Sequence, residues 1–431
     1  MKYLGFKDEF FRQSGLMFIG ISLFNLSNLL YHLFMIRALP PIDYGHLNGL
    51  IALFMIISVP ASTVQTTATK FVSSFQAQNQ FGHVKSLLRH LLLLMSTVGL
   101  SLFLLITLGS SHISSFLQIS SPGLVILFGL SLAFAMVIPV PWGGLQGLQK
   151  FGLLTLSLII NGGLKFALGA LFVFLGFGLL GAMSAIAVSY FVTTILSLFI
   201  IGVSLSKEKV AANQEVIPKG STLFNILEVY HYFFSVGLAL LCFMVLTNID
   251  LILVKHFFTP VEAGYYSIAQ MVGKIILFLP LPIVMVMFPK LSSLEGQGEK
   301  ALSTLGKSLG IAVFLCGGAI LFSLLFPSLI IRILSGKVYL ECLPLVGMFS
   351  INMALFSLTL ILLHYHLSTR KRWFLYPLFF STLIEIGLII LFHNTLNQVL
   401  WVVGIVAFCL FVINFYLAYR PDQSKRKEEF A

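Results

Sequence analysis

The sequence has little charge and few cysteines. Charged residues make up 10% of its 431 residues, and only 15 residues are Asp or Glu. Soluble domains carry about 25% charged residues, so the composition excludes an ordinary soluble protein. The cysteines are scattered and form no CxxC pair, which argues against a disulfide framework or a metal site and predicts that the protein has no cofactor. They are Cys242, Cys316, Cys342 and Cys409.

Recognisable catalytic motifs are also missing. We find no nucleotide-binding loop, no catalytic triad and no cluster of metal ligands in the sequence. An integral-membrane polysaccharide polymerase or a lipid-sugar glycosyltransferase stays an alternative, but such enzymes usually need a large outer loop with an acidic or arginine-rich motif. The first outer loop expected here holds one acid, Asp43. We therefore predict that the chain is not an enzyme.

The sequence is rich in long hydrophobic segments. Hydrophobic residues make up 58% of the chain and its mean hydropathy is +1.00. Apolar runs of about twenty residues, enough to cross a bilayer as a helix, recur along the whole chain. We predict an all-α polytopic membrane protein with about twelve transmembrane helices. Their ranges are 14–36, 47–70, 87–108, 123–147, 151–174, 179–203, 228–254, 264–288, 304–326, 342–366, 374–393 and 397–418.

Basic residues are distributed unevenly between the predicted loops. Most of the 26 lysines and arginines fall on the side that holds both termini. The positive-inside rule places that side in the cytoplasm, so we predict a multi-pass protein of the cell membrane with cytoplasmic termini. The net charge of +11 then reflects topology, which excludes nucleic acid as a partner. The other side has only Arg37, Lys255, Arg332 and Lys337, and Lys165 and Lys274 lie inside spans.

The chain repeats itself at an offset of about 220 residues. Each half starts with a span and a P-x-[DE]-x-G motif, which we interpret as a turn. The aligned pairs are Pro41–Pro260, Asp43–Glu262, Gly45–Gly264, Pro60–Pro280, Lys70–Lys290, Ser73–Ser293 and Lys150–Arg370. An even number of spans per half preserves orientation, which predicts two six-helix bundles related as a parallel repeat. The predicted lobes are 1–205 and 225–420, with a linker at 206–224 and a cytoplasmic tail at 421–431.

The two aligned prolines lie inside the second and eighth predicted spans. Proline removes a backbone donor and bends a helix, so Pro60 and Pro280 would loosen both spans at matching places. Such flexibility suits transport by alternating access, in which the halves rearrange around a central site. Static kinks that serve packing alone are the alternative.

Polar side chains recur at helical spacing inside several predicted spans. They are Asn25, Asn28 and His32; Ser157, Asn161 and Lys165; Tyr266, Gln270 and Lys274; Ser381 and Glu385; and Asn248 with Asp250. Spacings of three, four and seven put each set on one helix face. An ionisable group at mid-bilayer costs roughly 2.5–3.5 kcal/mol, so it usually faces a cavity or a partner. We expect a water-filled cavity between the halves with basic groups in it.

Lys274 is the main candidate for binding an anion. A lysine well inside a span offers a mobile point charge that suits phosphate oxygens. A fixed ion pair between Lys274 and Asp250 is the alternative, and the two roles can coexist. Arg37 and Lys255 are expected where the first and seventh spans reach the outer surface.

Two further charges occupy equivalent positions in the repeat with opposite sign. Lys165 and Glu385 could pair, stay in separate lobes or serve structure alone, and Glu385 could take a proton during transport. The stripe of Asn25, Asn28 and His32 could instead form hydrogen bonds between helices.

Three segments carry a resemblance to a known group. They are "RALPPIDYGHLNGL" after the first span, "LQGLQKF" after the fourth, and "DLILVKHFFTPVEAGYYSIAQ" in the second half. Together with two six-helix halves they resemble the oligosaccharide-flippase branch of the multidrug/oligosaccharidyl-lipid/polysaccharide (MOP) exporter superfamily. The resemblance covers nearly the whole chain and specifies the superfamily better than the substrate.

The resemblance implies a flippase that moves a polyprenyl-diphosphate-linked oligosaccharide from the cytoplasmic to the outer leaflet for cell-surface polysaccharide biosynthesis. Its partners would be that lipid and the bilayer, and could include a polysaccharide polymerase and glycosyltransferases. Cavity lysines and arginines of the family often bind the head group. By resemblance this points to Arg37, Lys255 and Lys274, and more weakly to Lys70, Lys165 and Lys290. The coupling ion would be a proton or sodium.

Other members of the superfamily are the alternatives. Multidrug exporters resemble the chain in architecture, but they typically carry acids in spans of the N-terminal lobe for cation coupling, and no predicted span of the first half holds one. Lipid II flippases generally have two more spans. Both departures favour the oligosaccharide flippase.

Overall fold

A computed structural model describes residues 2–119, 121–211, 237–284, 287, 291, 298–368 and 373–419. The chain divides into two compact units, residues 1–241 and 242–431, and each is described by itself. The predicted linker at 206–224 and tail at 421–431 lie largely or wholly outside the described residues, so the predicted domain boundaries stay predictions.

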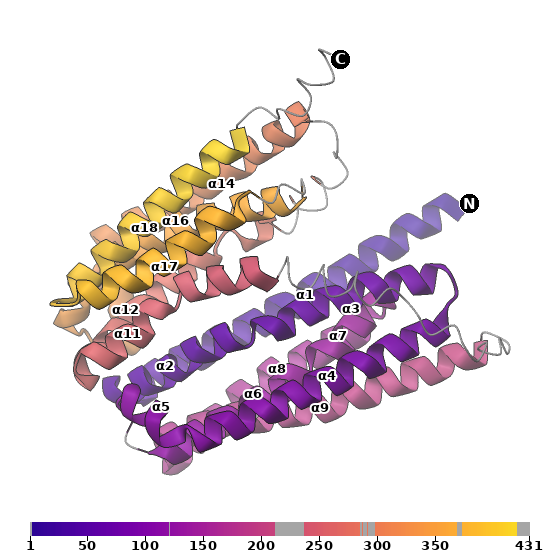
Figure 1. Cartoon of the computed structure of the whole chain (residues 1–431), viewed down its shortest axis with the longest axis horizontal. Coiled ribbons are helices and arrows are strands. Elements are labelled where there is room, and N and C mark those ends of the chain that lie inside the picture. The colour runs from indigo at the N-terminus through magenta and orange to yellow at the C-terminus, as the bar shows by residue number, and fades with distance from the viewer. Residues whose placement is uncertain are drawn as a thin grey trace. The chain divides into compact units, whose positions relative to one another are not determined.

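The first unit is built only of helices in its described part (Figure 1). They are α1 (Lys2–Ala38), α2 (Pro41–Ile57), α3 (Val59–Ala77), α4 (Phe81–Leu108), α5 (Ser110–Phe116), α6 (Pro122–Val137), α7 (Pro139–Gly147), α8 (Phe151–Phe172), the π-helical η1 (Val173–Phe177) and α9 (Gly178–Ala211). Helix α8 packs between α1 and α9, α4 packs against α6, and α3 against α7.

Helices α8 and α9 form an antiparallel hairpin, although together they make one apolar stretch of 56 residues, Phe151–Ser206. The chain turns at Gly176 and Gly178, whose φ angles are +90° and +51°. Glycine adopts positive φ without the clash that a Cβ would cause. Hydrogen bonds between the helices, Ser157 with Ser197 and Asn161 with Thr193, run in antiparallel register. The stretch is therefore the predicted fifth and sixth spans.

The second unit is also helical in its described part. Its helices are Gly237–Leu246 (which begins just before the unit boundary), α11 (Ile249–Phe257), α12 (Pro260–Phe278), α14 (Gly298–Leu325), α15 (Pro327–Ser335), the 3-10 turn η2 (Leu340–Cys342), α16 (Leu343–Ser368), α17 (Leu375–Leu391) and α18 (Leu396–Tyr419). Helix α16 packs against α12, α14 and α18, and α17 packs against α18 and α11. Most of α16 is buried, which makes it the centre of this unit.

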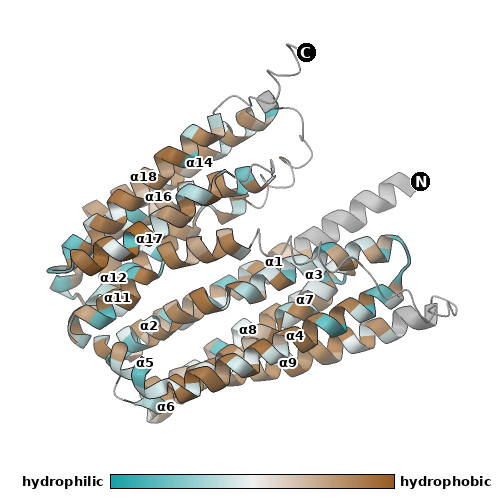
Figure 2. Cartoon of the chain, viewed as in Figure 1, coloured by the Kyte–Doolittle hydropathy of each residue, from teal (hydrophilic) through white to brown (hydrophobic). Residues whose placement is uncertain are grey.

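The helices confirm a polytopic membrane protein. Eight described helices are long and apolar enough to cross a membrane, and two bent helix pairs raise the number to 10. Helix α17 is apolar but shorter. With the α8–α9 hairpin counted as two, each predicted span corresponds to a described helix or helix pair. Figure 2 shows the hydrophobic residues along most of the length of these helices and the hydrophilic ones mainly near their ends.

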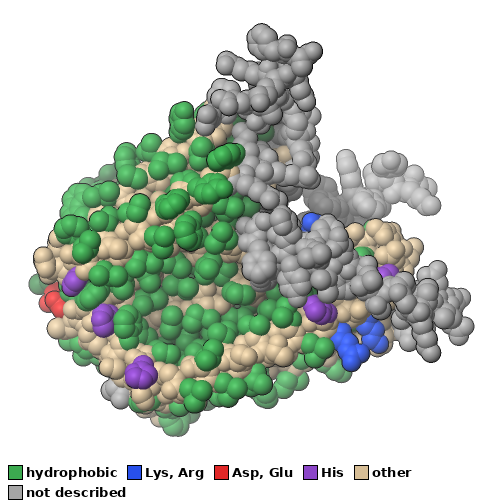
Figure 3. Space-filling model, viewed as in Figure 1, with side chains coloured by type: hydrophobic (Ala, Val, Ile, Leu, Met, Phe, Trp, Pro, Cys, Tyr) green, Lys and Arg blue, Asp and Glu red, His purple; other side chains and the backbone are tan. Residues whose placement is uncertain are grey.

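The surface is apolar, as a bilayer requires. Large side chains that soluble proteins bury are exposed here: Phe174 is 85% exposed, Leu108 82% and Phe314 79%. On the face drawn in Figure 3, hydrophobic side chains cover most of the described surface and few charged ones are visible. Lipid tails, rather than water, are the solvent for such a surface.

The repeated P-x-[DE]-x-G motif corrects the sequence interpretation, because in both units it is the first turn of a helix. Pro41 and Pro260 are the first residues of α2 and α12. Proline suits this position since the amide it lacks would have no partner in the helix. In α12, Thr259 and Glu262 complete a capping box, in which the backbone amide of each is bonded by the side chain of the other.

In the described part of the chain, two spans are bent by more than 40°. Helices α2 and α3 meet at 43° around Ser58, two residues before Pro60, which confirms the predicted kink. Helix α12 ends at Phe278, just before Pro280. The second bend, 42° between Gly237–Leu246 and α11, has no proline and was not predicted.

Candidate functional site

At the unpredicted bend in the second unit, two polar side chains bond their own helix. Thr247 donates its hydroxyl to the carbonyl of Phe243 at 2.9 Å, and Asn248 donates its Nδ2 to the carbonyl of Met244 at 2.8 Å. Side chains that bond the backbone in this way commonly bend helices. The amide nitrogen of Asn248 is thereby used within its own helix, and its carbonyl oxygen bonds another helix.

Lys274 on α12 bonds that oxygen. Its ammonium donates to Oδ1 of Asn248 at 2.7 Å, and the lysine is 9% exposed. Tyr266, Gln270 and Lys274 follow one another at intervals of four, so they share one face of α12 as predicted. All three are buried, and that face turns toward α11.

Asp250 is fully buried, and its carboxylate accepts hydrogen bonds from two side chains. The hydroxyl of Tyr266 donates to its Oδ2 at 2.8 Å, and Nε2 of Gln270 donates to Oδ1 at 3.2 Å. The Lys274 ammonium lies near enough to attract it electrostatically. The hydrogen bond of Lys274 nevertheless goes to the neutral Asn248, so the direct ion pair considered from sequence is not the contact this structure gives.

Glu385 on α17 is the second carboxylate of this cluster and differs from the first. Its side chain is fully buried, and neither carboxylate oxygen has a hydrogen-bond partner. Asp250 and Tyr266 both interact with it electrostatically, which places it beside the α11–α12 contacts. We call Asn248, Asp250, Tyr266, Gln270, Lys274 and Glu385 the C-unit cluster.

The first unit has a smaller cluster around Lys165. The ammonium of Lys165, on α8, donates to Oδ1 of Asn28 on α1 and lies 4.9 Å from the ring centre of Tyr31. Asn28 uses its Nδ2 on the carbonyl of Phe24 at 2.9 Å. The contacts of Lys165 are thus to neutral groups, an amide oxygen and an aromatic face. We call Asn28, Tyr31 and Lys165 the N-unit cluster.

Other predicted polar positions serve helix packing. Ser157 and Asn161 share a stripe with Lys165, but they bond Ser197 and Thr193 on α9 rather than facing α1. His32 lies 3.4 Å from the hydroxyl of Tyr44 through its Nδ1. Ser157 and Asn161 thus bond a neighbouring helix, and for His32 the predicted alternative of bonding between helices stays open.

The remaining predicted site residues are Asn25, Arg37 and Lys255. Asn25 and Arg37 are exposed, and Arg37 stands in the last turn of α1. Lys255 stands in the last turn of α11, where its side chain is buried.

The sequence interpretation missed Tyr31. Its ring makes a cation–π contact with the Lys165 ammonium, and its hydroxyl donates to the carbonyl of Ala182 at 3.0 Å. The sequence feature that could have identified Tyr31 is its position three residues after Asn28, which puts both on the same helix face. Tyrosine counts as apolar in a hydropathy profile, so the polar stripe was drawn without it.

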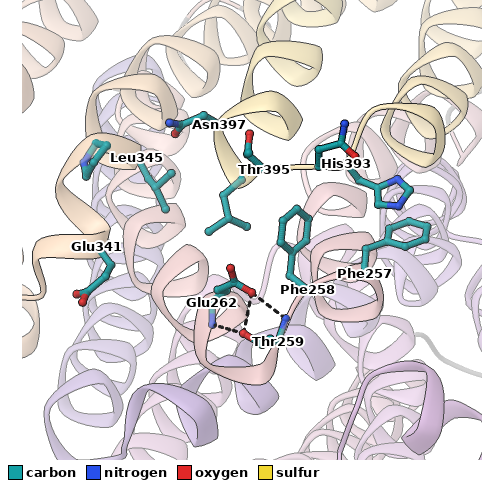
Figure 4. Close-up of a pocket in the computed structure, with 12 residues that line it drawn as sticks. Phe257, Phe258, Thr259, Glu262, Glu341, Leu345, His393, Thr395 and Asn397 are labelled. Atoms are coloured by element: carbon teal, nitrogen blue, oxygen red, sulfur yellow. Dashed lines mark hydrogen bonds between the residues drawn. The ribbon is translucent and has the colours of Figure 1, made fainter.

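A pocket of about 500 Å³ opens at one end of the second unit, where three connecting segments meet (Figure 4). It is lined by Phe257, Phe258, Thr259, Glu262, Glu341, Pro344, Leu345, His393, Asn394, Thr395, Leu396 and Asn397. His393 stacks on Phe257 with ring centres 3.9 Å apart, and Glu262 is held by Thr259. None of the predicted site residues lines it.

Neither cluster is built like a metal centre. In the described part of the chain, no three His, Cys, Asp or Glu side chains come together in a way that could hold a metal ion. The two clusters instead contain cations and hydrogen-bonding groups. Each unit has one lysine that donates to an asparagine side chain, and the second unit also has two carboxylates.

Comparison with protein families gives one match. The family described as "Polysaccharide biosynthesis protein" matches residues 11–295 of the 431. No curated protein matches the chain by sequence.

Solved structures match the fold over nearly the whole chain. An inward-facing multidrug resistance MATE family transporter of the MOP superfamily superposes with a TM-score of 0.76 at 14% identity, covering 93% of this chain and 97% of that one. The lipid II flippase MurJ in an inward closed conformation gives 0.70 at 14%, covering 94% and 87%. A MOP superfamily transporter from Pyrococcus furiosus Vc1, described by the reverse polarity of its binding pocket, gives 0.64 at 16%, covering 94% of each chain.

Proposed function

Because the chain belongs to the polysaccharide biosynthesis protein family and has the fold of MOP superfamily transporters, we propose that it flips a polyprenyl-diphosphate-linked oligosaccharide across the cell membrane. The lipid moves from the cytoplasmic to the outer leaflet by alternating access, and both termini of the chain lie in the cytoplasm. The protein is a multi-pass membrane protein of the polysaccharide biosynthesis protein family. Its transport activity, the substrate, the direction and the cytoplasmic termini are the proposal.

The observation that carries the proposal is the pair of lysines inside the spans. Lys165 and Lys274 each donate to an asparagine oxygen, so neither ammonium is neutralised by the group that holds it. A charge inside a membrane span usually faces a partner, a cavity or a ligand, and an anionic ligand would suit both lysines. A diphosphate, which carries two or more negative charges and many acceptor oxygens, is such a ligand.

Lys274 is the residue we assign to the diphosphate. An ammonium has three donors, and the hydrogen bond to Asn248 uses one of them. The others are free to be turned toward phosphate oxygens. Lys255 and Arg37, at the last turns of α11 and α1, would attract the head group near the helix ends. Asn25, His32 and Gln270 would add hydrogen bonds to sugar hydroxyls.

Export of organic cations is the second candidate, since multidrug transporters share the fold. Cationic drugs would need acidic groups in the transport path. Between Phe10 and Ser206, which include every described span of the first unit, the sequence holds one acid, Asp43 at the start of α2. Lysines inside the spans would repel such cargo, so the anionic lipid fits better.

The test is transport in proteoliposomes that contain the purified full chain. A fluorescent polyprenyl-diphosphate oligosaccharide is loaded into one leaflet, and its appearance in the other is followed. We expect crossing that depends on the protein and is lost in Lys274→Ala but kept in Lys307→Ala, which removes an exposed lysine. Movement of small organic cations in place of the lipid would assign the same architecture to drug export.

A further inference from the structure

The pocket at the end of the second unit has the size of a small-molecule site. Its volume of about 500 Å³ falls within the range of roughly 300–1,000 Å³ that is usual for ligand-binding clefts. All twelve residues that line it belong to the second unit. They come from the connections α11–α12, η2–α16 and α17–α18 and from the helix ends beside them. Three segments far apart in the sequence thus build one concave surface.

Two edges of the pocket are fixed by helix caps. On the first edge, Thr259 and Glu262 complete the capping box of α12. On the second, at the start of α18, the amide of Gln398 donates to Oγ1 of Thr395 at 3.2 Å, and the amide of Asn394 donates to Oε1 of Gln398 at 3.0 Å. Both edges are therefore held in place before a ligand arrives, which lowers the entropic cost of binding.

The lining combines hydrogen-bonding groups with apolar surface. Glu262 and Glu341 have acceptor oxygens, and the side-chain amides of Asn394 and Asn397 have both donors and acceptors. All four side chains are exposed, so a ligand from the solvent can reach them. The apolar part of the lining is made by Phe257, Phe258, Pro344, Leu345 and Leu396. Figure 4 shows two of these, Phe258 and Leu345, between the polar side chains of α12 and those at the start of α18.

The charge of the pocket distinguishes it from the two lysine clusters. Among the described residues that line it, two are glutamates and none is Lys or Arg. Two carboxylates repel phosphate and other anions. They do not form a metal site with His393, because no group of three His, Cys, Asp or Glu in the described part of the chain could hold a metal ion. The pocket therefore suits a polar molecule without negative charge.

We propose that this pocket binds a saccharide without acidic groups, at a site separate from both lysine clusters. Each hydroxyl of a sugar donates and accepts, so it matches the carboxylates together with the amides of Asn394 and Asn397. The C–H face of a sugar ring is apolar and would pack against Phe258 and Leu345. A positively charged peptide or amine would meet the carboxylates, but it would leave the amide donors without partners.

The saccharide has two conceivable sources. One is the sugar chain of the lipid that we propose as cargo, and the other is a glycan already present outside the cell. The three connections that form the pocket belong to the side predicted to face outward, so a cargo sugar bound there has already crossed the membrane. The first source rests on the proposed function, whereas saccharide binding itself does not.

Binding is tested by saturation-transfer difference NMR on the full chain in lipid nanodiscs. The probes are the methyl glycosides of glucose, galactose, mannose and N-acetylglucosamine, with methyl glucuronide as the acidic sugar. We expect saturation of at least one neutral glycoside and none of the glucuronide. The double variant Asn394→Ala/Asn397→Ala should bind that glycoside on the order of tenfold more weakly. Gln78→Ala, which removes an exposed amide at the end of α3, is the matched control and should bind normally.

A second variant tests the charge of the pocket by a gain of binding. Glu341→Lys replaces an exposed carboxylate with an ammonium, so it should admit methyl glucuronide, which the wild type repels. This result does not depend on the folding of the double variant.

Three results would overturn the proposal. No neutral glycoside is saturated above the level of empty nanodiscs, or the double variant binds as tightly as Gln78→Ala, or lysine ethyl ester binds the wild type while every neutral glycoside fails. The last result would assign the pocket to a cationic peptide or amine.

The flipping assay distinguishes the two sources of the saccharide. If the pocket takes the sugar chain of the cargo, the double variant should need a higher concentration of lipid-linked oligosaccharide for half-maximal flipping, and Gln78→Ala should not. Unchanged flipping with weakened glycoside binding would assign the pocket to a glycan from elsewhere. Glycoside binding without flipping of any diphosphate lipid would instead contradict the proposed function and leave the saccharide site standing.

Discussion

Asn28 and Asn248 each accept a hydrogen bond from the ammonium of a lysine, Lys165 in the first unit and Lys274 in the second. The two asparagines are equivalent in the repeat, at an offset of about 220 residues. The lysines are not, because Lys165 comes from the fifth span of its unit and Lys274 from the second. Each unit thus has an asparagine oxygen that accepts from a lysine, but the lysine comes from a different helix in each.

Lys274 is expected to be essential for transport. Lys274→Ala removes a charge-assisted hydrogen bond to phosphate, which costs about 1.5–3 kcal/mol, or roughly ten- to a hundredfold in transport rate. Lys274→Arg keeps the charge and should retain part of the activity. Flipping in proteoliposomes measures the effect, with Lys307→Ala as the matched control. Wild-type transport by Lys274→Ala, with normal insertion, would remove this residue from the site.

The face of α12 could be predicted because spacing alone determines it. Tyr266, Gln270 and Lys274 stand four residues apart, and the structure places all three among the α11–α12 contacts. The same argument grouped Ser157 and Asn161 with Lys165, but it did not show that the first two bond α9 while Lys165 bonds α1. Periodicity gives the face of a helix but not the neighbour that packs on it, and α8 lies between α1 and α9.

The partner of Lys274 could not be derived from the sequence either. Opposite charges nearby suggested Asp250 as one alternative partner, whereas in the structure the ammonium bonds the amide oxygen of Asn248. No proline or glycine marks the bend before α11, where Thr247 and Asn248 bond the backbone of their own helix. Sequence patterns therefore predicted the spans and most of the cluster, while its hydrogen bonds depended on a local distortion without a sequence signal.

Asn248 is expected to position Lys274 rather than to bind cargo itself. Asn248→Ala removes the acceptor and leaves the ammonium without its 2.7 Å bond, which should raise the concentration of lipid needed for half-maximal flipping. Asn248→Asp should hold the ammonium in an ion pair and reduce flipping more strongly. Equal activity of both variants and the wild type would show that the bond has no part in transport.

Tyr266 is expected to stabilise the fold through Asp250. Tyr266→Phe keeps the ring that meets Phe349 edge-on at 4.7 Å, but it removes the 2.8 Å donor to a buried carboxylate. The loss should be about 1–3 kcal/mol of unfolding free energy. Thermal unfolding in nanodiscs measures it, with Tyr376→Phe at an exposed tyrosine as the control. If Tyr266→Phe and the wild type melt at the same temperature, the hydrogen bond to Asp250 does not stabilise the fold.

Close helix packing in the first unit depends on Gly143 of α7. A Cβ there would lie 2.6 Å from the backbone oxygen of Gln65 on α3, so α3 and α7 would have to separate. Gly143→Ala should destabilise the protein by about 1–3 kcal/mol. Gly163 of α8 has no atom within 4 Å of such a Cβ, so Gly163→Ala is the matched control and should cause no loss. Thermal unfolding of both variants decides the point.

The proposed orientation can be tested by labelling from one side of the membrane. Lys337, after α15, belongs to the side predicted to face outward, and Lys85, at the start of α4, to the cytoplasmic side. Because Cys409 is exposed, single cysteines are introduced as Lys337→Cys and Lys85→Cys in a chain whose own cysteines are replaced by serine or alanine. A membrane-impermeant maleimide added to intact cells should label position 337 and reach position 85 only after the membrane is opened. The positive-inside rule gives this direction because basic loops resist translocation. Labelling of position 85 in intact cells would reverse the orientation, and with it the direction in which the lipid is flipped.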